Sequence, residues 1–208
     1  MEIPLRPDGV RLIETFGWDG TRFARLDRHL ARARAGAARL GFAWNDDAVT
    51  SALSGIGGPE PLRVRLTVGA SGDAEATVAT LAPAASLWRV AVAADRLSSD
   101  DPWLRLKTTR RALYDRSRAA LPTGIDEFLF LNERDELCEG TITNIFFDLG
   151  EGLMTPPLAS GCLPGILRAE LVETGRCREA ALHAKDMPRA RLWVGNALRG
   201  LIAAELSG

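Results

Sequence analysis

The seven residues LRVRLTV, from Leu62 to Val68, alternate strictly between apolar and polar side chains. Successive side chains on a β-strand point to opposite faces, so this pattern predicts a strand with one face buried and the other in water. A half-buried strand needs partners in a sheet and a layer that covers its apolar face. The pattern therefore requires a fold that contains a sheet.

Helical patterns precede this strand, and further strand patterns follow it. Apolar residues recur from Leu30 to Leu40 at helical spacing, with Asp27 as a candidate N-cap and Gly41 near the end. A second helix is predicted from Asn45 to Leu53, with Asn45 as its N-cap. The fold class is therefore predicted as α+β. The other predicted strands are residues 10–14, 22–26, 76–81, 88–93, 127–131, 143–148, 153–155 and 191–194, and the other predicted helices are residues 109–120 and 165–175.

The polar segment DRLSSDDP, residues 95–102, ends in proline and interrupts the run of predicted elements. At 208 residues the chain can form one large domain or two small ones. We predict a small N-terminal α/β domain over residues 1–94, a linker over residues 95–102, and a larger C-terminal α/β domain over residues 103–208.

Charge and cysteine content exclude several classes of function. The 26 Lys and Arg residues balance 27 Asp and Glu residues, and the net charge of −1 gives no broad basic field for nucleic acid or an anionic membrane. The sequence shows neither the roughly 20-residue apolar run of a membrane span nor an apolar leader at its N-terminus. With 3 cysteines, no Cys-x-x-Cys pair and 2 histidines, we expect no metal site and free thiols in a reducing cytoplasm.

Lysine is rare in this chain, since Lys107 and Lys185 are the only lysines and arginine fills the other cationic positions. Lys107 follows an apolar-rich segment, residues 103–106, and precedes a predicted helix. An amine that is partly desolvated beside arginines loses its charge more readily, and a neutral amine can attack a carbonyl to form a Schiff base. The alternative interpretation is an exposed lysine at a helix N-terminus.

The segment EGTITNIFF, which begins at Glu139, opens with a carboxylate and a glycine and then becomes apolar. A buried acid at this point could face the nitrogen of a pyridine ring and keep it protonated, which makes the ring an electron sink. The alternative is an ordinary turn before a strand.

Two loops and one arginine are candidates for binding an anion. Gly165, Ile166 and Leu167 begin a predicted helix, whose first backbone N–H groups can bind phosphate. The segment from Gly195 to Ala197 follows a predicted strand in the same manner, and Arg32 lies on the first long helix. The alternatives are ordinary connections and a solvated arginine on a helix face.

The order and spacing of these segments resemble those of a known family. LKTTRRALYD, EGTITNIFF, TPPLASGCLPGILR and GNALRG together make the chain similar to the class IV aminotransferases, the pyridoxal-phosphate enzymes of fold type IV. An H-x-x-R segment, from His29 to Arg32, also matches. The resemblance implies a two-domain α+β fold like that of D-amino-acid aminotransferase, here shortened at both ends, and pyridoxal 5'-phosphate as the cofactor.

The resemblance also implies roles for individual residues. Lys107 resembles the Schiff-base lysine and catalytic base, Glu139 the partner of the pyridine nitrogen, and Arg32 the phosphate-binding arginine. The remaining positions that it implies for cofactor binding are Asn144, Gly165, Ile166, Leu167, Asn196 and Ala197.

Within the family, Leu167 and the Asn-Ala-Leu segment at 196–198 are similar to lyase-like members that convert 4-amino-4-deoxychorismate to 4-aminobenzoate and pyruvate. This resemblance implies a small amine substrate that carries a carboxylate, and a homodimer. Thr108, Arg105 and Arg110 are candidates for contacting the substrate. Two alternatives stay open: a transaminase for branched-chain or D-amino acids, and a relative that binds the cofactor without catalysis.

Overall fold

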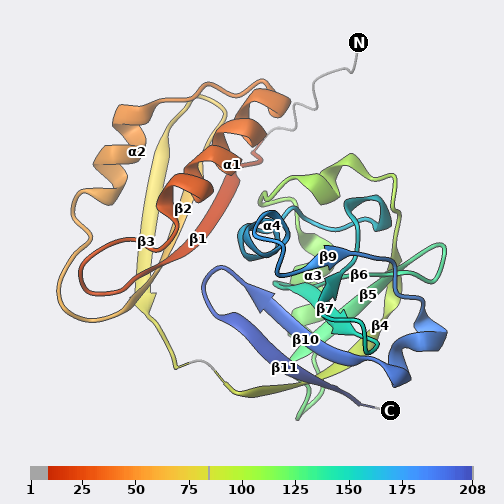
Figure 1. Ribbon diagram of the computed structural model, residues 1–208. Coiled ribbons are helices and arrows are strands. Elements are labelled where there is room, and N and C mark those ends of the chain that lie inside the picture. Colours follow the sequence, from red (N-terminus) through yellow and green to blue (C-terminus); the bar gives the residue numbers. More distant parts are fainter. Residues whose placement is uncertain (1–8, 84, 208) are drawn as a thin grey trace. The chain divides into compact units, whose positions relative to one another are not determined.

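The structure, a computed structural model, describes residues 9–83 and 85–207 and divides the chain into two compact units (Figure 1). The first unit contains the described part of Met1–Pro83 together with Leu106–Arg110, and the second contains Ala84–Arg105 and Arg111–Gly208. Helices accompany a sheet in each unit, which confirms the predicted α+β class.

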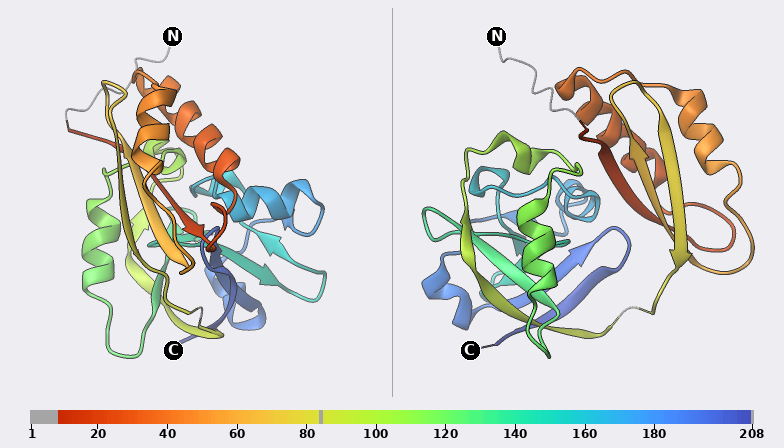
Figure 2. Two further views of the ribbon diagram at one scale, coloured as in Figure 1. Left: turned by 90° about the vertical axis from the view of Figure 1, so that its left-hand side faces the viewer. Right: turned by 180° about the vertical axis from the view of Figure 1, so that it is seen from behind.

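An antiparallel sheet of three strands, in the order β1-β2-β3, forms the centre of the first unit. The strands are β1 (Leu12–Trp18), β2 (Leu62–Val68) and β3 (Ala74–Thr80). β2 has the bounds that the alternating pattern predicted, and its buried residues occupy every second position. Helices α1 (Leu26–Leu40) and α2 (Asp46–Leu53) cover one face of this sheet, as both views in Figure 2 show.

Local signals at the helix ends explain most of these bounds. The side chain of Asn45 accepts a hydrogen bond from the Ala48 N–H at 3.1 Å, so the predicted N-cap of α2 is confirmed. Gly41 ends α1 in the left-handed conformation, at φ 66°, as expected for a glycine after a helix. At the other end of α1 the prediction was wrong, because Arg25 rather than Asp27 precedes the first helical turn.

The strand predicted at residues 22–26 is also wrong. This segment makes an isolated bridge between Trp18 and Phe23, after which the chain enters α1. The Asp19 carboxylate accepts hydrogen bonds from the N–H groups of Thr21 and Arg22, each at 2.9 Å. The Asp19 side chain thus binds backbone N–H groups that would need partners on a neighbouring strand if this segment were a β-strand.

Six strands of the second unit form a closed ring, because β10 pairs with both β11 and β7. The sheet order is β10-β11-β4-β5-β6-β7-β8-β9. The strands are β4 (Leu87–Leu97), β5 (Glu127–Asn132), β6 (Leu137–Gly140), β7 (Asn144–Asp148), β8 (Met154–Thr155), β9 (Arg178–Glu179), β10 (Arg191–Asn196) and β11 (Gly200–Leu206). The helical elements are η1 (Pro102–Arg105), α3 (Ala112–Ala119), η2 (Leu158–Ser160), α4 (Ile166–Glu173) and η3 (Ala184–Arg189).

The main core of the second unit is formed by side chains from these strands. Leu129 on β5, Leu137 on β6, Phe147 on β7 and Val194 on β10 are completely buried in one apolar cluster. Because the ring of strands closes around these residues, the loops at its edge rest on a rigid support.

The division into units differs from the predicted boundary at residues 95–102. β4 continues to Leu97 and pairs in parallel with both β5 and β11, so residues 87–97 belong to the second unit. Conversely, the Ile13 N–H donates to the Lys107 carbonyl at 2.8 Å and the Thr109 N–H donates to the Arg11 carbonyl at 2.9 Å, which ties residues 106–110 to the first unit. Backbone pairing, which composition does not reveal, decides both assignments.

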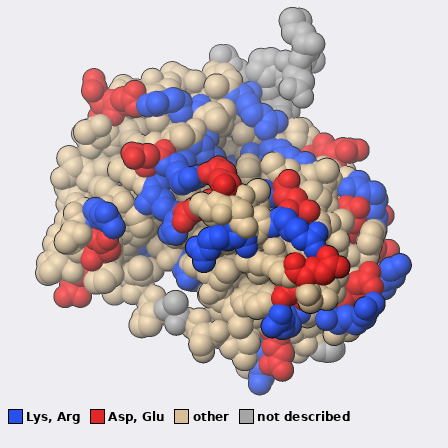
Figure 3. Space-filling view, viewed as in Figure 1, with Lys and Arg blue, Asp and Glu red and all other residues tan. Residues whose placement is uncertain are grey.

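Charged side chains of both signs lie interspersed on the face shown in Figure 3. None of the helices in the described ranges is long and apolar enough to cross a membrane.

Phe147→Ala should lower the free energy of unfolding by about 3–5 kcal/mol, because it opens a cavity among completely buried side chains. Urea denaturation would measure this loss. Leu149→Ala, two residues further along and 43% exposed, is the matched control and should change stability little. Equal losses in the two variants would contradict the position of the core.

Candidate active site

The backbone around Lys107 is fixed by β1. Besides the bond from Ile13 to the Lys107 carbonyl, Thr108 forms an isolated bridge with Leu12. The Thr108 hydroxyl accepts a hydrogen bond from the Arg110 N–H at 3.2 Å, and Thr108 is buried. Lys107 itself is half-buried. The strand therefore determines where the chain presents this lysine within the first unit.

A buried carboxylate holds Arg32 in the same unit. Nε and Nη2 of Arg32 donate to the two oxygens of Glu14 on β1, at 2.8 and 2.6 Å, and Nδ1 of His29 lies 2.6 Å from the same carboxylate. Burial raises the pKa of Glu14, but the charge of Arg32 and the hydrogen bonds from His29 and Arg32 outweigh it, so the pKa is lowered. The pair at positions 29 and 32 lies on one face of α1, which explains the H-x-x-R spacing.

In the second unit, Glu139 is fixed by two hydrogen-bond donors. The Tyr114 hydroxyl on α3 donates to Oε1 at 2.6 Å, and the Leu163 N–H donates to Oε2 at 2.9 Å. Glu139 is 6% exposed. Hydrogen bonds donated to a carboxylate stabilise its charged form, so this environment suits a buried negative charge.

The turn between β6 and β7 is organised by Glu127, a carboxylate with no exposed surface. It accepts hydrogen bonds from the N–H groups of Thr141 and Ile142 at 3.0 and 3.2 Å, and from the Thr143 hydroxyl at 3.1 Å. A Cβ atom at Gly140 would lie 2.9 Å from this carboxyl group, so only glycine fits there. Glu127 thereby fixes the turn that separates Glu139 from Asn144.

Asn144 connects β7 to the start of α4. Its Nδ2 donates to the Leu163 carbonyl at 2.9 Å. A Cβ atom at Gly165, the N-cap of α4, would lie 3.0 Å from Cγ of Asn144 and still closer to its Oδ1. No described side chain caps this helix, and its first N–H groups belong to Ile166 and Leu167. Such a helix start has the donors that bind anions.

Asn196 shapes the turn between β10 and β11. Its Oδ1 accepts hydrogen bonds from the N–H groups of Leu198 and Arg199 at 3.1 and 3.0 Å, and its Nδ2 donates to the Ile142 carbonyl at 3.2 Å. This last bond joins the turn, which includes Ala197, to the turn between β6 and β7. Hydrogen bonds and close packing therefore link the predicted positions 139, 144, 165 and 196 within the second unit, whereas Arg32, Lys107, Thr108 and Arg110 belong to the first unit.

The family model for "Amino-transferase class IV" matches residues 11–205. The chain belongs to the class IV aminotransferase family. A crystal structure from Mesorhizobium loti, provisionally described as an amino-acid aminotransferase, is 46% identical, has a TM-score of 0.88, and matches 95% of this chain and 100% of its own. The predicted fold type IV class is therefore confirmed.

Two similar proteins carry the name aminodeoxychorismate lyase. The one from Schizosaccharomyces pombe, provisionally so named, is 28% identical over 176 residues, which cover 81% of this chain and 75% of that protein. The one from Saccharomyces cerevisiae is 31% identical over 128 residues, covering 52% of this chain and 33% of the yeast protein. A protein from Mycobacterium tuberculosis, described as a hypothetical aminotransferase in its pyridoxal-phosphate-bound form, shares the fold at 19% identity and a TM-score of 0.79, with 99% of this chain and 86% of that chain covered.

Class IV aminotransferases are enzymes that depend on pyridoxal phosphate, and the residues described above fit this group. Glu139 offers a buried carboxylate for a ring nitrogen, Lys107 an amine, and the start of α4 backbone donors for a phosphate. The chemistry of the cofactor and that of the available donors therefore agree.

Sequence patterns did not reveal three supporting residues: Tyr114, Glu127 and Glu14. Tyr114 carried a usable signal, since it is the only tyrosine in the chain and lies in the same LKTTRRALYD segment as Lys107. Glu127 and Glu14 act through partners distant in sequence, and neither has a local pattern that marks it.

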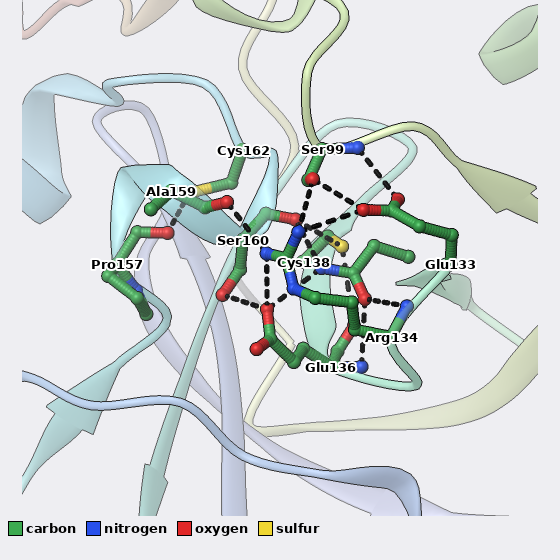
Figure 4. A network of polar contacts seen from close by, with 10 residues as sticks. Ser99, Glu133, Arg134, Glu136, Cys138, Pro157, Ala159, Ser160 and Cys162 are labelled. Carbon is green, nitrogen blue, oxygen red and sulfur yellow. Dashed lines mark hydrogen bonds and ion pairs between the residues drawn. The ribbon is translucent and has the colours of Figure 1, made fainter.

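Figure 4 shows the polar network that supports the loop before α4. Arg134, in the turn between β5 and β6, donates to the Ala159 carbonyl at 2.9 Å and to Glu136 at 2.8 Å. Glu136 also accepts from the Ser160 hydroxyl at 2.9 Å, and Asn132 donates to the Ser160 carbonyl at 2.9 Å. The network thus fixes the loop that leads to Leu163, whose N–H donates to Glu139.

Arg105 contacts the same loop, since its Nη1 donates to the Cys162 carbonyl at 3.0 Å. The three cysteines are free and buried. Burial is the main cause that raises the pKa of Cys162 to about 12 and that of Cys177 to about 11, so both stay protonated thiols near neutral pH.

Gly165→Ala should lower the free energy of unfolding by about 1–3 kcal/mol, because the added methyl group overlaps the Asn144 side chain. The backbone at Gly165, with φ −68° and ψ 147°, suits any residue, so the cost reports the lack of space alone. Gly57→Ala is the matched control, because a Cβ there has no atom within 4 Å. Chemical denaturation that shows no difference between the two variants would refute the close approach of Asn144.

Glu136 should make stability depend on pH. The hydrogen bond from Arg134 is the main cause that lowers its pKa from 4.5 to about 2. Its contribution to stability is present above about pH 4.5 and is lost as pH falls toward 2, because the unfolded chain takes up the proton first.

The two pKa values define a window of about pH 5 to about pH 2.5. Within this window, the free energy of unfolding of Glu136→Gln should fall less than that of the wild type, as measured by urea denaturation. Glu75→Gln, at a side chain that is 73% exposed, should follow the wild-type profile. A Glu136→Gln profile parallel to that of the wild type would contradict the role of this ion pair.

Proposed function

We propose that this chain is a pyridoxal-phosphate-dependent lyase that converts 4-amino-4-deoxychorismate to 4-aminobenzoate and pyruvate. The observation that carries the proposal is the buried carboxylate of Glu139, held by two donors in a chain whose curated relatives are named for this reaction. The Asn-Ala-Leu segment at 196–198, which resembles lyase-like members, supports the same choice.

Each proposed cofactor contact has a distinct task. Glu139 would pair with the ring nitrogen, and Lys107 would carry the cofactor. Arg32 and the N–H groups of Ile166 and Leu167 would bind the phosphate. The remaining cofactor-binding positions, which would shape the loops around it, are Asn144, Gly165, Asn196 and Ala197.

Lys107 would also move the proton of the reaction. When bound, pyridoxal phosphate supplies an electron sink for negative charge that develops at the reacting carbon. Once the substrate amine has replaced it as the point of attachment, the freed Nζ atom of Lys107 would remove the proton from the substrate carbon that bears the amine. The bond between the neighbouring ring carbon and the ether oxygen would then break, so that enolpyruvate leaves with this oxygen and the ring becomes aromatic. Lys107 or Thr108 would return a proton to the departing enolpyruvate as pyruvate forms.

A transaminase is the second candidate, because the Mesorhizobium loti structure, at 46% identity, is described as an amino-acid aminotransferase. The cofactor and the role of Lys107 would be the same. A transaminase needs a keto acid as second substrate, whereas the lyase needs only one substrate.

The substrate contacts and the assembly stay predictions. Arg110 and Arg105 are the proposed partners of the substrate carboxylates, although the Arg105 guanidinium already binds the Cys162 carbonyl. We expect a homodimer in the cytoplasm.

Lysine chemistry offers a direct test, since the chain has only two lysines. Borohydride reduction of the loaded protein followed by peptide mapping should find the cofactor on Lys107. Lys107→Ala should lower turnover by roughly 10²–10⁴-fold or more, because both the attachment point and the base are lost. Lys185→Ala should keep wild-type activity, and cofactor on Lys185 would overturn the assignment.

Product analysis separates the two activities. With 4-amino-4-deoxychorismate alone, the lyase should release pyruvate and 4-aminobenzoate in equal amounts. Turnover of an amino acid that requires an added keto acid, without pyruvate release from 4-amino-4-deoxychorismate, would instead establish the transaminase.

A further inference from the structure

Tyr114 has a fixed position that none of the proposed cofactor contacts accounts for. Its ring meets Phe130 edge to face, with the centroids 5.4 Å apart at 83°, and the Arg111 guanidinium lies 5.8 Å from the ring centroid. These contacts orient the side chain so that its hydroxyl reaches Oε1 of Glu139 at 2.6 Å. The hydroxyl is therefore held by the protein before any ligand binds.

The direction of this hydrogen bond follows from the charges around it. Burial raises the pKa of Tyr114, and the nearby negative charge of Glu139 and the hydrogen bond to it raise it further. The other charged or titratable neighbours are Cys138 and Arg111, of which Arg111 lowers the pKa. The phenol thus stays protonated and donates to an acceptor that is stable as an anion.

The two donors to Glu139 are not equivalent. The donor to Oε2 is the backbone N–H of Leu163, whose position depends on the loop before α4. The donor to Oε1 is a side chain held by a helix and by an aromatic contact. A carboxylate fixed at both oxygens cannot rotate freely, so its direction is set before it meets a cofactor.

We propose that Tyr114 is a positioning residue that acts through Glu139: its hydroxyl holds the carboxylate in one orientation and maintains its negative charge for the ring nitrogen of the cofactor. The inference rests on the proposed function, since that function pairs Glu139 with the ring nitrogen. Without Tyr114, the carboxylate would be freer to rotate, which weakens its hold on a protonated ring.

Because Tyr114 is the only tyrosine, a protein labelled with ¹³C at tyrosine Cζ should give a single resonance that reports this contact. In the wild type, the phenol should remain protonated throughout the alkaline range in which the protein stays folded. In Glu139→Gln, the resonance should move and the phenol should ionise at lower pH, because the neighbouring negative charge is gone. A resonance unaffected by Glu139→Gln would overturn the proposal.

A double-mutant cycle tests whether Tyr114 acts through Glu139. Tyr114→Phe keeps the ring and removes the hydroxyl, so we expect kcat to fall by about tenfold with little change in KM, the loss of one charge-assisted hydrogen bond. In the Glu139→Gln background the same change should lower kcat by about twofold at most, because the coupled charge is already absent. Equal losses in both backgrounds would show that Tyr114 does not act through Glu139.

Thr174→Val provides the matched control, since it removes an exposed hydroxyl that donates to the Glu170 carbonyl at 2.7 Å, outside the site. It should leave the tyrosine resonance and kcat unchanged. Because the tyrosine resonance is measured without substrate, its response tests the Tyr114–Glu139 contact separately from the proposed lyase activity. A response to Glu139→Gln without conversion of 4-amino-4-deoxychorismate would refute the proposed substrate and retain the contact.

Discussion

The buried carboxylate of Glu127 determines the geometry of the second unit's site. A carboxylate without exposed surface is costly unless its oxygens accept hydrogen bonds, and here the turn at residues 141–143 supplies them. Removing this carboxylate would leave several buried donors unsatisfied, at about 1–3 kcal/mol each. Since Glu139 and Asn144 pair with each other at the two ends of this turn, their positions depend on Glu127.

The first unit uses the same principle with different residues. Glu14 has 1% exposure and accepts hydrogen bonds from two nitrogens of Arg32, which fixes the guanidinium plane as a single nitrogen contact would not. His29 makes the third contact to this carboxylate. In both units, a buried acid with satisfied oxygens therefore orients the polar groups around it, and the proposed cofactor contacts lie among these oriented groups.

Local patterns predicted the elements that local physics controls. The alternation at Leu62–Val68, the N-cap Asn45 and the helix end at Gly41 each depend on residues within a few positions, and all three were confirmed. The boundary at 95–102 was wrong because β4 is held by β5 and β11, which lie far along the chain. Polar composition indicated a linker, whereas backbone pairing extends the strand to Leu97.

The same distinction applies to the site. Lys107 stood out in the sequence because lysine is rare, and Glu139 because it begins a Glu-Gly pair; both match a family pattern. Their supports did not, because the contacts of Tyr114 to Glu139 and of Glu127 to Thr141 join different elements. Sequence therefore indicated which groups could do chemistry, and only the three-dimensional contacts indicate what holds them.

Two glycines show why these supports are hidden within a recognisable motif. A glycine before a turn or a helix is usually attributed to backbone freedom, yet Gly165 has an ordinary φ of −68°. At Gly165, the Asn144 side chain occupies the space that a Cβ atom would need. At Gly140, the carboxyl group of Glu127 and the Thr143 hydroxyl occupy it. Each glycine is thus required by a polar group on another segment. The Glu-Gly and Pro-Gly pairs are consequently parts of one packed unit, in which a change at Gly165 displaces Asn144 and a change at Gly140 displaces Glu127 or Thr143.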